Sequence, residues 1–545
     1  MLSHQIFHDL QQEPSNDPAV IEAQPVYHED NESTQSREAA QRSRRKERKF
    51  LHAFRFWSIM GFTSTLMCTW ELAIALSSFS LVDGGRGGFV WTYIGTMIAM
   101  SSVVASLAEI TSMAPTHGGV YHWVSEFVPQ RAQKYLGYVV GWMLTVAWQA
   151  GAAALNLVAA QLIQGIISMW QPDTEPPRWQ VTLLTLAFGL LSTGFNTAGV
   201  KQLPVIELVI LVLHFFGIFV VLAPLWALAP KSSAKTVFQG FEDNGGWGDI
   251  GVACMVGMIG SLFAFSRVDG AAHIGEKIRH ASRIVPGSMA ATFLLNGLLG
   301  ILAVFTVAFS ITDINIKLDI SRTPSAEVVV AIFQKATDSK PLATVMTLVL
   351  VILIFGASLS VLATSARHIF AFAKDEGLPF PNLWRKVSRV SGAHDALPFN
   401  AFILSMSFTI LVATVYLAYD DVLRFSITVF LSCTLTGYAI VLGFVLFKRL
   451  FSKELPKRHW SLGSFSILVN AFAFLYIMLC FGLSFAPTTK AELSLKTANW
   501  SGIVWVLIAL FASVVYAIHG RYVFKGAGMI PSTRSFEELP SSRNT

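Results

Sequence analysis

The stretch MVGMIGSLFAFSRVDGAAHIG, residues 255–275, places an arginine, an aspartate and a histidine at the end of an apolar run that begins near Gly251. An earlier apolar stretch, WSIMGFTSTLMCTWELAIAL, residues 57–76, carries several hydroxyl side chains and then Glu71. An unpaired charge at the centre of a bilayer costs about 2.5 kcal/mol or more. Charge at this depth therefore predicts that both stretches belong to a functional site inside a membrane protein.

The composition supports a membrane environment. The 545 residues are 53% hydrophobic and only 14% charged, compared with about 25% charged residues in a typical soluble protein. A helix needs about 20 mostly apolar residues to cross the hydrocarbon core of a bilayer. We therefore predict an all-α integral membrane protein with about twelve spans, near 54–79, 89–110, 136–165, 180–198, 204–228, 249–271, 287–312, 342–371, 400–419, 422–447, 463–485 and 500–519.

The ends of the chain predict its orientation. Residues 1–50 are polar and read as a disordered tail, which ends in the basic run RSRRKERK at residues 42–49. Beside a first span, such a run favours the positive-inside rule over a nucleic-acid or nuclear-targeting role. An even number of spans after a cytoplasmic N-terminus makes residues 521–545 a cytoplasmic C-terminal tail. The net charge of +6 then reflects anchoring to a lipid bilayer and indicates no nucleic-acid partner.

Motifs for catalysis and metal binding are lacking in the sequence. Its four cysteines lie in apolar spans without metal-ligand spacing, and no phosphate-binding glycine loop or Ser/His/Asp set is present. We therefore expect no enzyme, no cofactor, no metal site and no disulfide framework.

The two charged stretches correspond to the first and sixth predicted spans, which are five spans apart. Paired interruptions at corresponding positions of two halves are typical of inverted-repeat transporters that bind substrate at the bilayer midplane. We place the breaks around Leu66 to Thr69 and around Phe265 to Val268. At a break, free N–H groups suit a carboxylate, and free carbonyls suit an ammonium or a coupling cation.

The charged residues of these two spans each allow two interpretations. Asp269 fits the N-cap of the second half of span six, or a substrate contact. Thr69 could cap the outer half of span one, with Glu71 in its first turn. The charge of Arg267 needs a partner. Arg267 either forms an ion pair with Glu71 or Asp269, or contacts a ligand.

Other polar residues inside the spans also leave two roles open. His214, in the middle of span five, is either a proton carrier or a neutral histidine bonded to a neighbour. Phe265 and Trp70 could close over a ligand or simply pack. The remaining group fits ligand or cation binding or interhelical hydrogen bonding, and comprises Gln149, Asn156, Ser358, Ser360, Thr364 and Ser365.

Three loop stretches carry a family resemblance: SLAEITSMAPTHGGVYHWVSEFVP at 106–129, DGAAHIGEKIRHASRIVPGSM at 269–289 and ARHIFAFAKDEGLPFPN at 366–382. Together with GFTSTLMCTWE at 61–71, they are similar to the fungal amino acid/choline transporter family of the amino acid-polyamine-organocation superfamily. The resemblance covers about residues 50 to 520. Members move amino acids, gamma-aminobutyrate, choline or polyamines, usually by proton symport.

The resemblance implies a LeuT-like fold in residues 51–520. Two inverted five-helix repeats, about 54–228 and 249–447, are followed by two helices at about 463–519, and the substrate lies between broken spans one and six. The implied binding residues are Thr65, Leu66, Met67, Cys68, Thr69 and Trp70 of span one and Phe265, Ser266, Arg267, Val268 and Asp269 of span six. The implied inner half-helix continues through His273 and Glu276, and Arg367 resembles the inner-gate arginine of the family.

Two positions depart from the family pattern. Arg267 stands where a small residue, usually glycine, is common, and Lys277 stands where a second glutamate is common. An unpaired Arg267 facing the cavity would disfavour choline and polyamines and favour carboxylate-bearing ligands. An Arg267 paired with Glu71 would instead narrow the site.

These observations predict a secondary transporter of amino acids or related nitrogenous compounds, with proton-coupled uptake. The plasma membrane is the expected location, and a vacuolar or other internal membrane is the alternative. An exporter of an alkaloid-like metabolite and a non-transporting nutrient receptor remain alternative functions.

Overall fold

The computed structural model describes residues 56–116, 118–173, 176–277, 280–312, 326–387, 398–419, 421–451, 454–487, 489–490 and 498–526. The predicted N-terminal tail, its basic run at 42–49 and all of the predicted C-terminal tail beyond residue 526 lie outside these residues. The described part of the chain is helical and contains no β-strand, although Asp83 and Asp243 form one isolated bridge.

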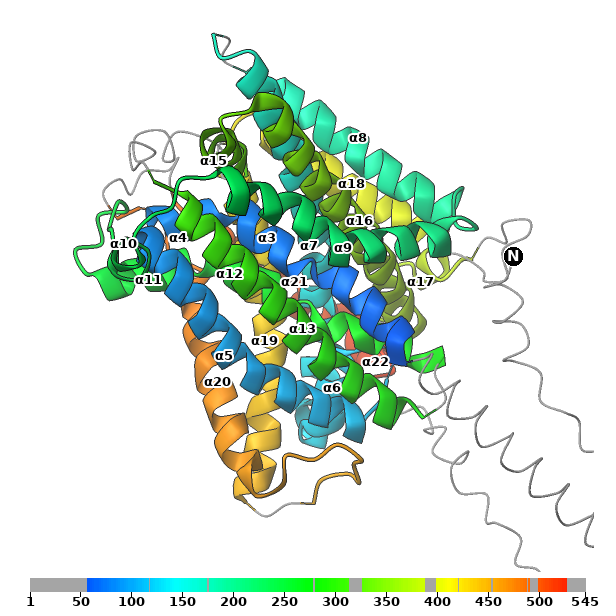
Figure 1. Cartoon of the computed structure of the whole chain (residues 1–545). Helices are drawn as coiled ribbons and strands as arrows, with labels where there is room; N and C mark the ends of the chain where they lie inside the picture. Colours follow the sequence, from blue (N-terminus) through cyan, green and yellow to red (C-terminus); the bar gives the residue numbers. More distant parts are fainter. Residues whose placement is uncertain are drawn as a thin grey trace, which may run out of the picture. The chain divides into compact units, whose positions relative to one another are not determined.

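The described helices are labelled in chain order in Figure 1. Residues 56–67 form the first helix. It is followed by α3 (Thr69–Ala75), α4 (Ser77–Val82), α5 (Gly85–Met113), α6 (Val120–Phe127), α7 (Gln130–Trp170), α8 (Arg178–Thr197), α9 (Leu203–Leu228), α10 (Ala234–Gln239), α11 (Ile250–Gly257), α12 (Ile259–Phe265), the 3-10 helix η1 (Val268–Lys277), α13 (Ala281–Ser310), α15 (Val328–Thr337), α16 (Lys340–Lys374), α17 (Pro381–Trp384), α18 (Phe399–Val415), α19 (Val422–Leu450), η2 (Gly463–Phe465), α20 (Ser466–Leu483), α21 (Ser501–Val515), the π-helix η3 (Tyr516–Gly520) and α22 (Arg521–Val523).

Ten helical segments of the described chain are long and apolar enough to cross a membrane. Span one is Phe56–Val82, and span six is Ile250–His273. The predicted spans near 180–198 and 400–419 correspond to α8 and to α18, a shorter apolar helix of 17 residues. The predicted all-helical membrane fold is confirmed.

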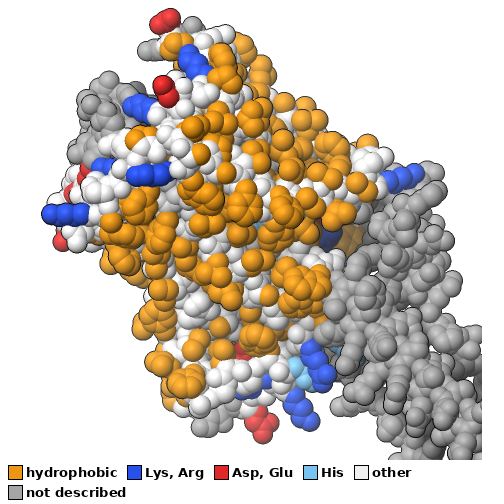
Figure 2. All heavy atoms as spheres, viewed as in Figure 1, with side chains coloured by type: hydrophobic (Ala, Val, Ile, Leu, Met, Phe, Trp, Pro, Cys, Tyr) orange, Lys and Arg blue, Asp and Glu red, His pale blue; other side chains and the backbone are white. Residues whose placement is uncertain are grey.

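The outer surface of these helices is apolar, as a lipid-facing surface requires. Hydrophobic side chains cover most of the face shown in Figure 2, and charged side chains gather toward its two ends. Large apolar side chains such as Phe216 and Leu190 are 67% and 61% exposed. A soluble protein rarely exposes apolar patches on this scale, so the surface is suited to a bilayer.

Helices that lie five predicted spans apart pack against each other. The short helix α3 of span one contacts α12 of span six. In the same way α5 packs against α13, α7 against α16, and α8 against α18. These pairings are the ones expected of two interlocked five-helix repeats, and they bring the interruptions of spans one and six together.

The helix of span one breaks at Cys68, inside the predicted interval. Cys68 adopts a left-handed backbone conformation, with φ of 49° and ψ of 48°. A non-glycine residue rarely adopts this conformation, and a single such residue interrupts the α-helix. The carbonyls of Leu66 and Met67, just before the break, are therefore displaced from regular helical bonding.

Span six breaks at Ser266 and Arg267, also as predicted. The α-helix α12 ends at Phe265, and the chain continues from Val268 as the 3-10 helix η1. Asp269 lies in the first turn of η1, so its predicted position as the N-cap residue was wrong.

The C-terminal end of span one and the first half of span six approach each other closely. Ser80 of α4 donates a 2.8 Å hydrogen bond to the carbonyl of Gly257. A Cβ on Gly257 would lie 2.8 Å from the carbonyl oxygen of Asp83, and a Cβ on Gly260 would lie 3.0 Å from that of Leu76. The glycines at these two positions therefore permit the close packing of α4 on α11 and α12.

Candidate functional site

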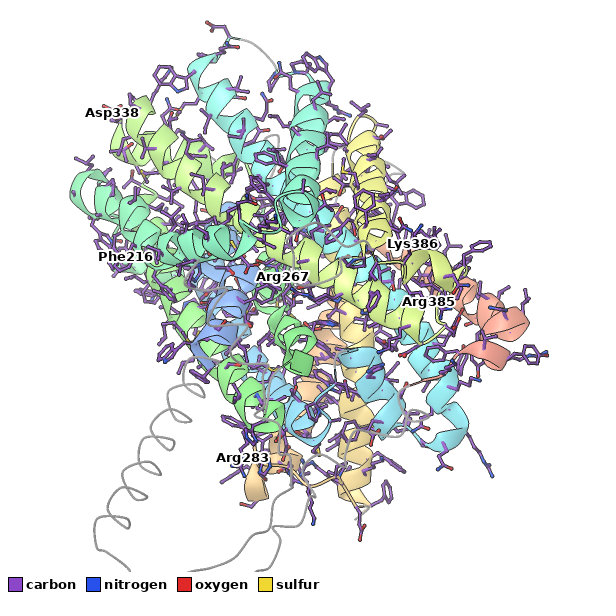
Figure 3. The ribbon with its side chains drawn as sticks, turned by 90° about the vertical axis from the view of Figure 1, so that its right-hand side faces the viewer. Phe216, Arg267, Arg283, Asp338, Arg385 and Lys386 are labelled. Atoms are coloured by element: carbon purple, nitrogen blue, oxygen red, sulfur yellow. The ribbon has the colours of Figure 1, made fainter. Side chains whose placement is uncertain are left out.

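Arg267 lies in the interior of the helical bundle, whereas Phe216, Arg283, Asp338, Arg385 and Lys386 lie nearer its periphery (Figure 3). Its side chain has 0% relative exposure. A charged group almost never occupies such a position without specific partners. The partners of Arg267 therefore define the chemistry of the site.

The guanidinium of Arg267 binds the main chain of span one at its break. Nε donates to the carbonyl of Leu66 at 3.2 Å, and Nη2 donates to the carbonyl of Met67 at 2.7 Å. The guanidinium carbon also lies 4.3 Å from the centroid of the Phe263 ring, which is a cation–π contact. An arginine of span six therefore occupies the carbonyls that the helix break of span one sets free.

This arrangement differs from the ion pair that the sequence left open. Within the described residues, neither Glu71 nor Asp269 forms an ion pair with Arg267, although both interact with it electrostatically. Glu71 instead pairs with His214. The carbonyls of Leu66 and Met67 are also unavailable to an ammonium ligand, because Arg267 already binds them.

Glu71 and His214 form the second feature of the site. Glu71 Oε1 lies 2.7 Å from His214 Nδ1, and His214 Nε2 lies 3.2 Å from Asn296 Oδ1. The Nδ2 group of Asn296 donates to the carbonyl of Ser64 at 3.2 Å. This last bond fixes the amide orientation of Asn296, so that its oxygen faces the histidine.

Asp269 is the second buried acid next to the break. It is 1% exposed, and its Oδ1 atom has no hydrogen-bond partner in the described structure. Tyr438 of α19 lies beside it and donates to the carbonyl of Ser266 at 3.2 Å. Tyr438 therefore joins span ten to the break in span six.

Three charged side chains around the breaks each keep one buried polar atom without a hydrogen-bond partner. Within the described residues these atoms are Nη1 of Arg267, Oε2 of Glu71 and Oδ1 of Asp269. Buried polar atoms are nearly always satisfied in folded proteins. One donor and two acceptors therefore remain available where spans one and six meet, and they suit a small polar ligand.

Aromatic side chains enclose these groups. Trp70 is 0% exposed and donates from Nε1 to the carbonyl of His214 at 3.1 Å. The Phe265 ring lies 5.2 Å from those of both Tyr93 and Phe293. Both rings therefore pack against neighbouring side chains or main chain in the interior of the bundle.

Several of the predicted binding residues donate hydrogen bonds to main-chain carbonyls. The hydroxyls of Thr65 and Ser266 donate to carbonyls three residues earlier, at 2.9 and 3.0 Å. Thr69 donates to the carbonyl of Ala264 at 3.2 Å, and α3 has no side-chain cap. The predicted capping role of Thr69 was therefore wrong, whereas Glu71 does lie in the first turn of α3.

The predicted inner-gate residue Arg367 and the predicted half-helix residue His273 both contact aromatic rings. Arg367 is exposed, with its guanidinium 5.7 Å from the centroid of the Phe62 ring. The His273 ring lies 5.7 Å from that of Trp148 and 6.0 Å from that of His368. The side chains of Glu276 and Lys277 lie outside the described part of the structure.

The polar residues Gln149 and Asn156 of α7 form hydrogen bonds with serines of α16. Gln149 donates to Ser365 at 2.6 Å, and Ser358 donates to Asn156 at 2.6 Å. Ser360 and Thr364 donate to carbonyls of their own helix. These bonds hold two long spans together, as interhelical hydrogen bonds commonly do in membranes.

Sequence reasoning missed Asn296, Phe263 and Tyr438. Asn296 and Tyr438 are polar residues inside the predicted spans 287–312 and 422–447, so intramembrane polarity was the available signal. Nothing in the sequence indicated a role for Phe263, because that role depends on the direction in which the Arg267 side chain points.

Comparison with known proteins agrees with this geometry. The amino acid permease family matches residues 54–523. The choline transporter of Saccharomyces cerevisiae is 26% identical over 422 residues, which cover 77% of this chain and 73% of that protein. An uncharacterised amino-acid permease of Schizosaccharomyces pombe is 25% identical over 485 residues, covering 88% and 87%. Amino-acid permease 2 of Neurospora crassa is 23% identical over 475 residues, covering 86% and 84%.

The helical bundle and its relatives define a multi-pass membrane transporter and not an enzyme. The chain belongs to the amino acid permease family, within the amino acid-polyamine-organocation superfamily. It is a transporter of amino acids or related compounds.

Proposed function

We propose that this protein is a proton-coupled uptake transporter that binds its substrate between the breaks of spans one and six and works by alternating access. In this proposal the plasma membrane holds the protein with both termini in the cytoplasm. The buried pair of Glu71 and His214 is the observation that carries the proposal.

The hydrogen bonds of this pair favour a bound proton. Both ring nitrogens of His214 face oxygen atoms, those of Glu71 and Asn296. A neutral histidine has only one N–H donor, whereas an imidazolium has two. Either His214 is protonated beside an ionised Glu71, or a protonated Glu71 donates to a neutral His214. Both arrangements hold one proton more than the ionised glutamate with a neutral histidine.

This proton site lies beside the proposed substrate site. Glu71 belongs to the same short helix that follows the break at Cys68, and it interacts electrostatically with Arg267, Cys68 and Tyr93. A movement of the half-helix in alternating access would change the distance between Glu71 and His214. Proton release and substrate release would then be coupled, as in other carriers with intramembrane acids.

Transport into liposomes tests the proposal. Liposomes containing the purified full-length protein would receive labelled amino acids, gamma-aminobutyrate, choline or putrescine, with and without an inward proton gradient. We expect the gradient to drive accumulation at least fivefold above equilibrium for at least one solute. The Glu71→Gln and His214→Gln variants should retain exchange of labelled for unlabelled solute but lose gradient-driven accumulation.

Glu207→Gln is the matched control, because Glu207 is an acid on the same helix as His214 and outside the pair. It should accumulate solute as the wild type does. Accumulation that ignores the proton gradient, or an unchanged Glu71→Gln variant, would contradict proton coupling through this pair.

A further inference from the structure

We propose that Arg267 is a tethered cation that fills the cation-binding position of broken span one, so that the ligand must carry a carboxylate. Compounds that are cations alone, such as choline and polyamines, are then excluded. This inference deepens the proposed function and rests on the substrate site lying at the two breaks.

The first argument is occupancy of the carbonyls. Free carbonyls at the end of a half-helix are the groups that can bind an ammonium or a metal cation. Here Leu66 and Met67 already accept from Arg267, at 3.2 and 2.7 Å. A ligand ammonium at this position would have to displace the guanidinium and would be repelled by it in a medium of low dielectric constant.

The second argument is the remaining donor. Nη1 of Arg267 is buried and has no hydrogen-bond partner in the described structure. The guanidinium is planar, and two of its three nitrogens are bound to span one, so its orientation is fixed. A carboxylate is the natural acceptor for such a group, because the bond is assisted by charge on both sides.

The third argument is the aromatic face. Quaternary ammonium ligands are commonly held over aromatic rings. Phe263 lies next to the break, but the guanidinium carbon of Arg267 already lies 4.3 Å from its centroid. The face of the Phe263 ring is therefore occupied by Arg267 and is not available to a choline-like ligand.

The fourth argument is the presence of two carboxylate oxygens without hydrogen-bond partners among the described residues. Oε2 of Glu71 and Oδ1 of Asp269 are buried acceptors without partners in the described chain. They suit the N–H groups of an amine, while Nη1 of Arg267 suits a carboxylate. A zwitterion such as an amino acid carries both groups, so its donors and acceptors match these three atoms in kind.

Two pairs of compounds test whether the ligand needs a carboxylate. Glycine betaine and choline share a trimethylammonium group, but only betaine has a carboxylate. Gamma-aminobutyrate and putrescine are related in the same way. Binding would be measured by the thermal shift of the full-length protein in detergent, and transport by exchange in liposomes. We expect the wild type to prefer the carboxylate member of at least one pair by tenfold or more.

Two substitutions test the role of Arg267. Arg267→Gly frees both carbonyls and Phe263, so the preference should fall at least tenfold, with a gain in choline or putrescine binding. Arg267→Lys keeps a positive charge for the carbonyls but lacks the planar third nitrogen. It should still exclude choline and putrescine, while binding of the carboxylate member weakens at least fivefold. The lysine variant tests the inference even where the glycine variant fails to fold.

Arg424→Lys is the matched control. Arg424 is also a buried arginine bonded to a main-chain carbonyl, that of Pro487, but it lies on α19. Its replacement should leave the preference ratio unchanged. Equal binding of both members of each pair by the wild type, or an unchanged ratio in both Arg267 variants, would overturn the inference and leave the transporter function standing. Failure of the wild type to bind or exchange any of the labelled compounds would overturn the proposed function itself, and this inference with it.

Discussion

His214 Nδ1 lies 2.7 Å from Glu71 Oε1, in a pair whose members come from two helices and are both fully buried. The second ring nitrogen of His214 reaches Asn296, and Asn296 reaches the main chain of span one at Ser64. Three spans, the first, fifth and seventh, therefore share one chain of hydrogen bonds next to the break at Cys68.

The Asn296→Leu variant tests this chain of bonds. Leucine has a similar volume but leaves Nε2 of His214 without its partner, and it removes one of the two donors to the carbonyl of Ser64, the other being the amide of Cys68. An unsatisfied buried polar group costs about 1–3 kcal/mol, so we expect a lower unfolding temperature and weaker proton-driven uptake. Asn470→Leu is the control, because this buried asparagine of α20 bonds to Ser106 away from the site. It should lower stability without changing the effect of the proton gradient, and equal loss of coupling in both variants would refute a specific role for Asn296.

The contact between α4 and α11 gives a second prediction. In the Gly257→Ala variant, the new Cβ would lie 2.8 Å from the carbonyl oxygen of Asp83 and 3.0 Å from that of Phe79. Main-chain atoms cannot move aside as side chains do, so overpacking should destabilise the fold by about 1–3 kcal/mol. Gly194→Ala, whose Cβ would have nothing within 4 Å, should show no such loss. Thermal unfolding of the two variants in detergent gives the comparison.

Asp83 predicts a pH dependence at the end of span one. Its side chain is 1% exposed, and burial raises its pKa from 3.8 to about 7, while Arg424 and Trp247 oppose the shift. A carboxyl group whose pKa is higher in the folded state stabilises the fold when it is protonated. This stabilisation is complete below about pH 4 and is lost as the pH rises to about 7.

The Asp83→Asn variant should remove this dependence. The unfolding temperature of the wild type relative to the variant should fall between pH 4 and pH 7 and then level off. Because the two proteins differ only at this side chain, the difference between them isolates Asp83. A difference that stays constant with pH would show that Asp83 does not titrate in this interval.

Phe524 gives a prediction for the C-terminal end of the bundle. It is 1% exposed, and its ring lies 5.2 Å from that of Tyr138 and 5.8 Å from that of Phe372. The amide of Lys525 donates to the carbonyl of Asp375 at 3.0 Å. The folded structure therefore continues beyond residue 520, where the sequence placed the start of the tail.

The Phe524→Ala variant should release this segment. Removing a buried phenylalanine side chain costs about 3–5 kcal/mol in a protein core, so we expect limited proteolysis near residue 524 to become at least tenfold faster. Tyr522→Ala is the control, since Tyr522 is 69% exposed. Similar cleavage rates in both variants would show that burial of Phe524 does not hold the segment.

The sequence by itself determined that the protein lies in a membrane, that it is helical, and where spans one and six break. Apolar runs of sufficient length dictate membrane helices, because a bilayer leaves main-chain groups no other partners. The polar residues around Cys68 and Arg267 indicated the breaks, because a charged side chain inside a membrane span requires a local partner. Each of these properties belongs to a single segment of the chain, so it can be predicted from the order of the residues alone.

Only the tertiary structure decided the partners of the charged side chains. Glu71, Asp269 and a main-chain carbonyl were all possible partners for Arg267, and the packing of span one against span six decides which of them lies within hydrogen-bond distance. The contact of α3 with α9 pairs Glu71 with His214, 143 residues away in the chain. A hydrogen bond depends on tenths of an ångström and on direction, and neither quantity is encoded in the spacing of residues along the chain.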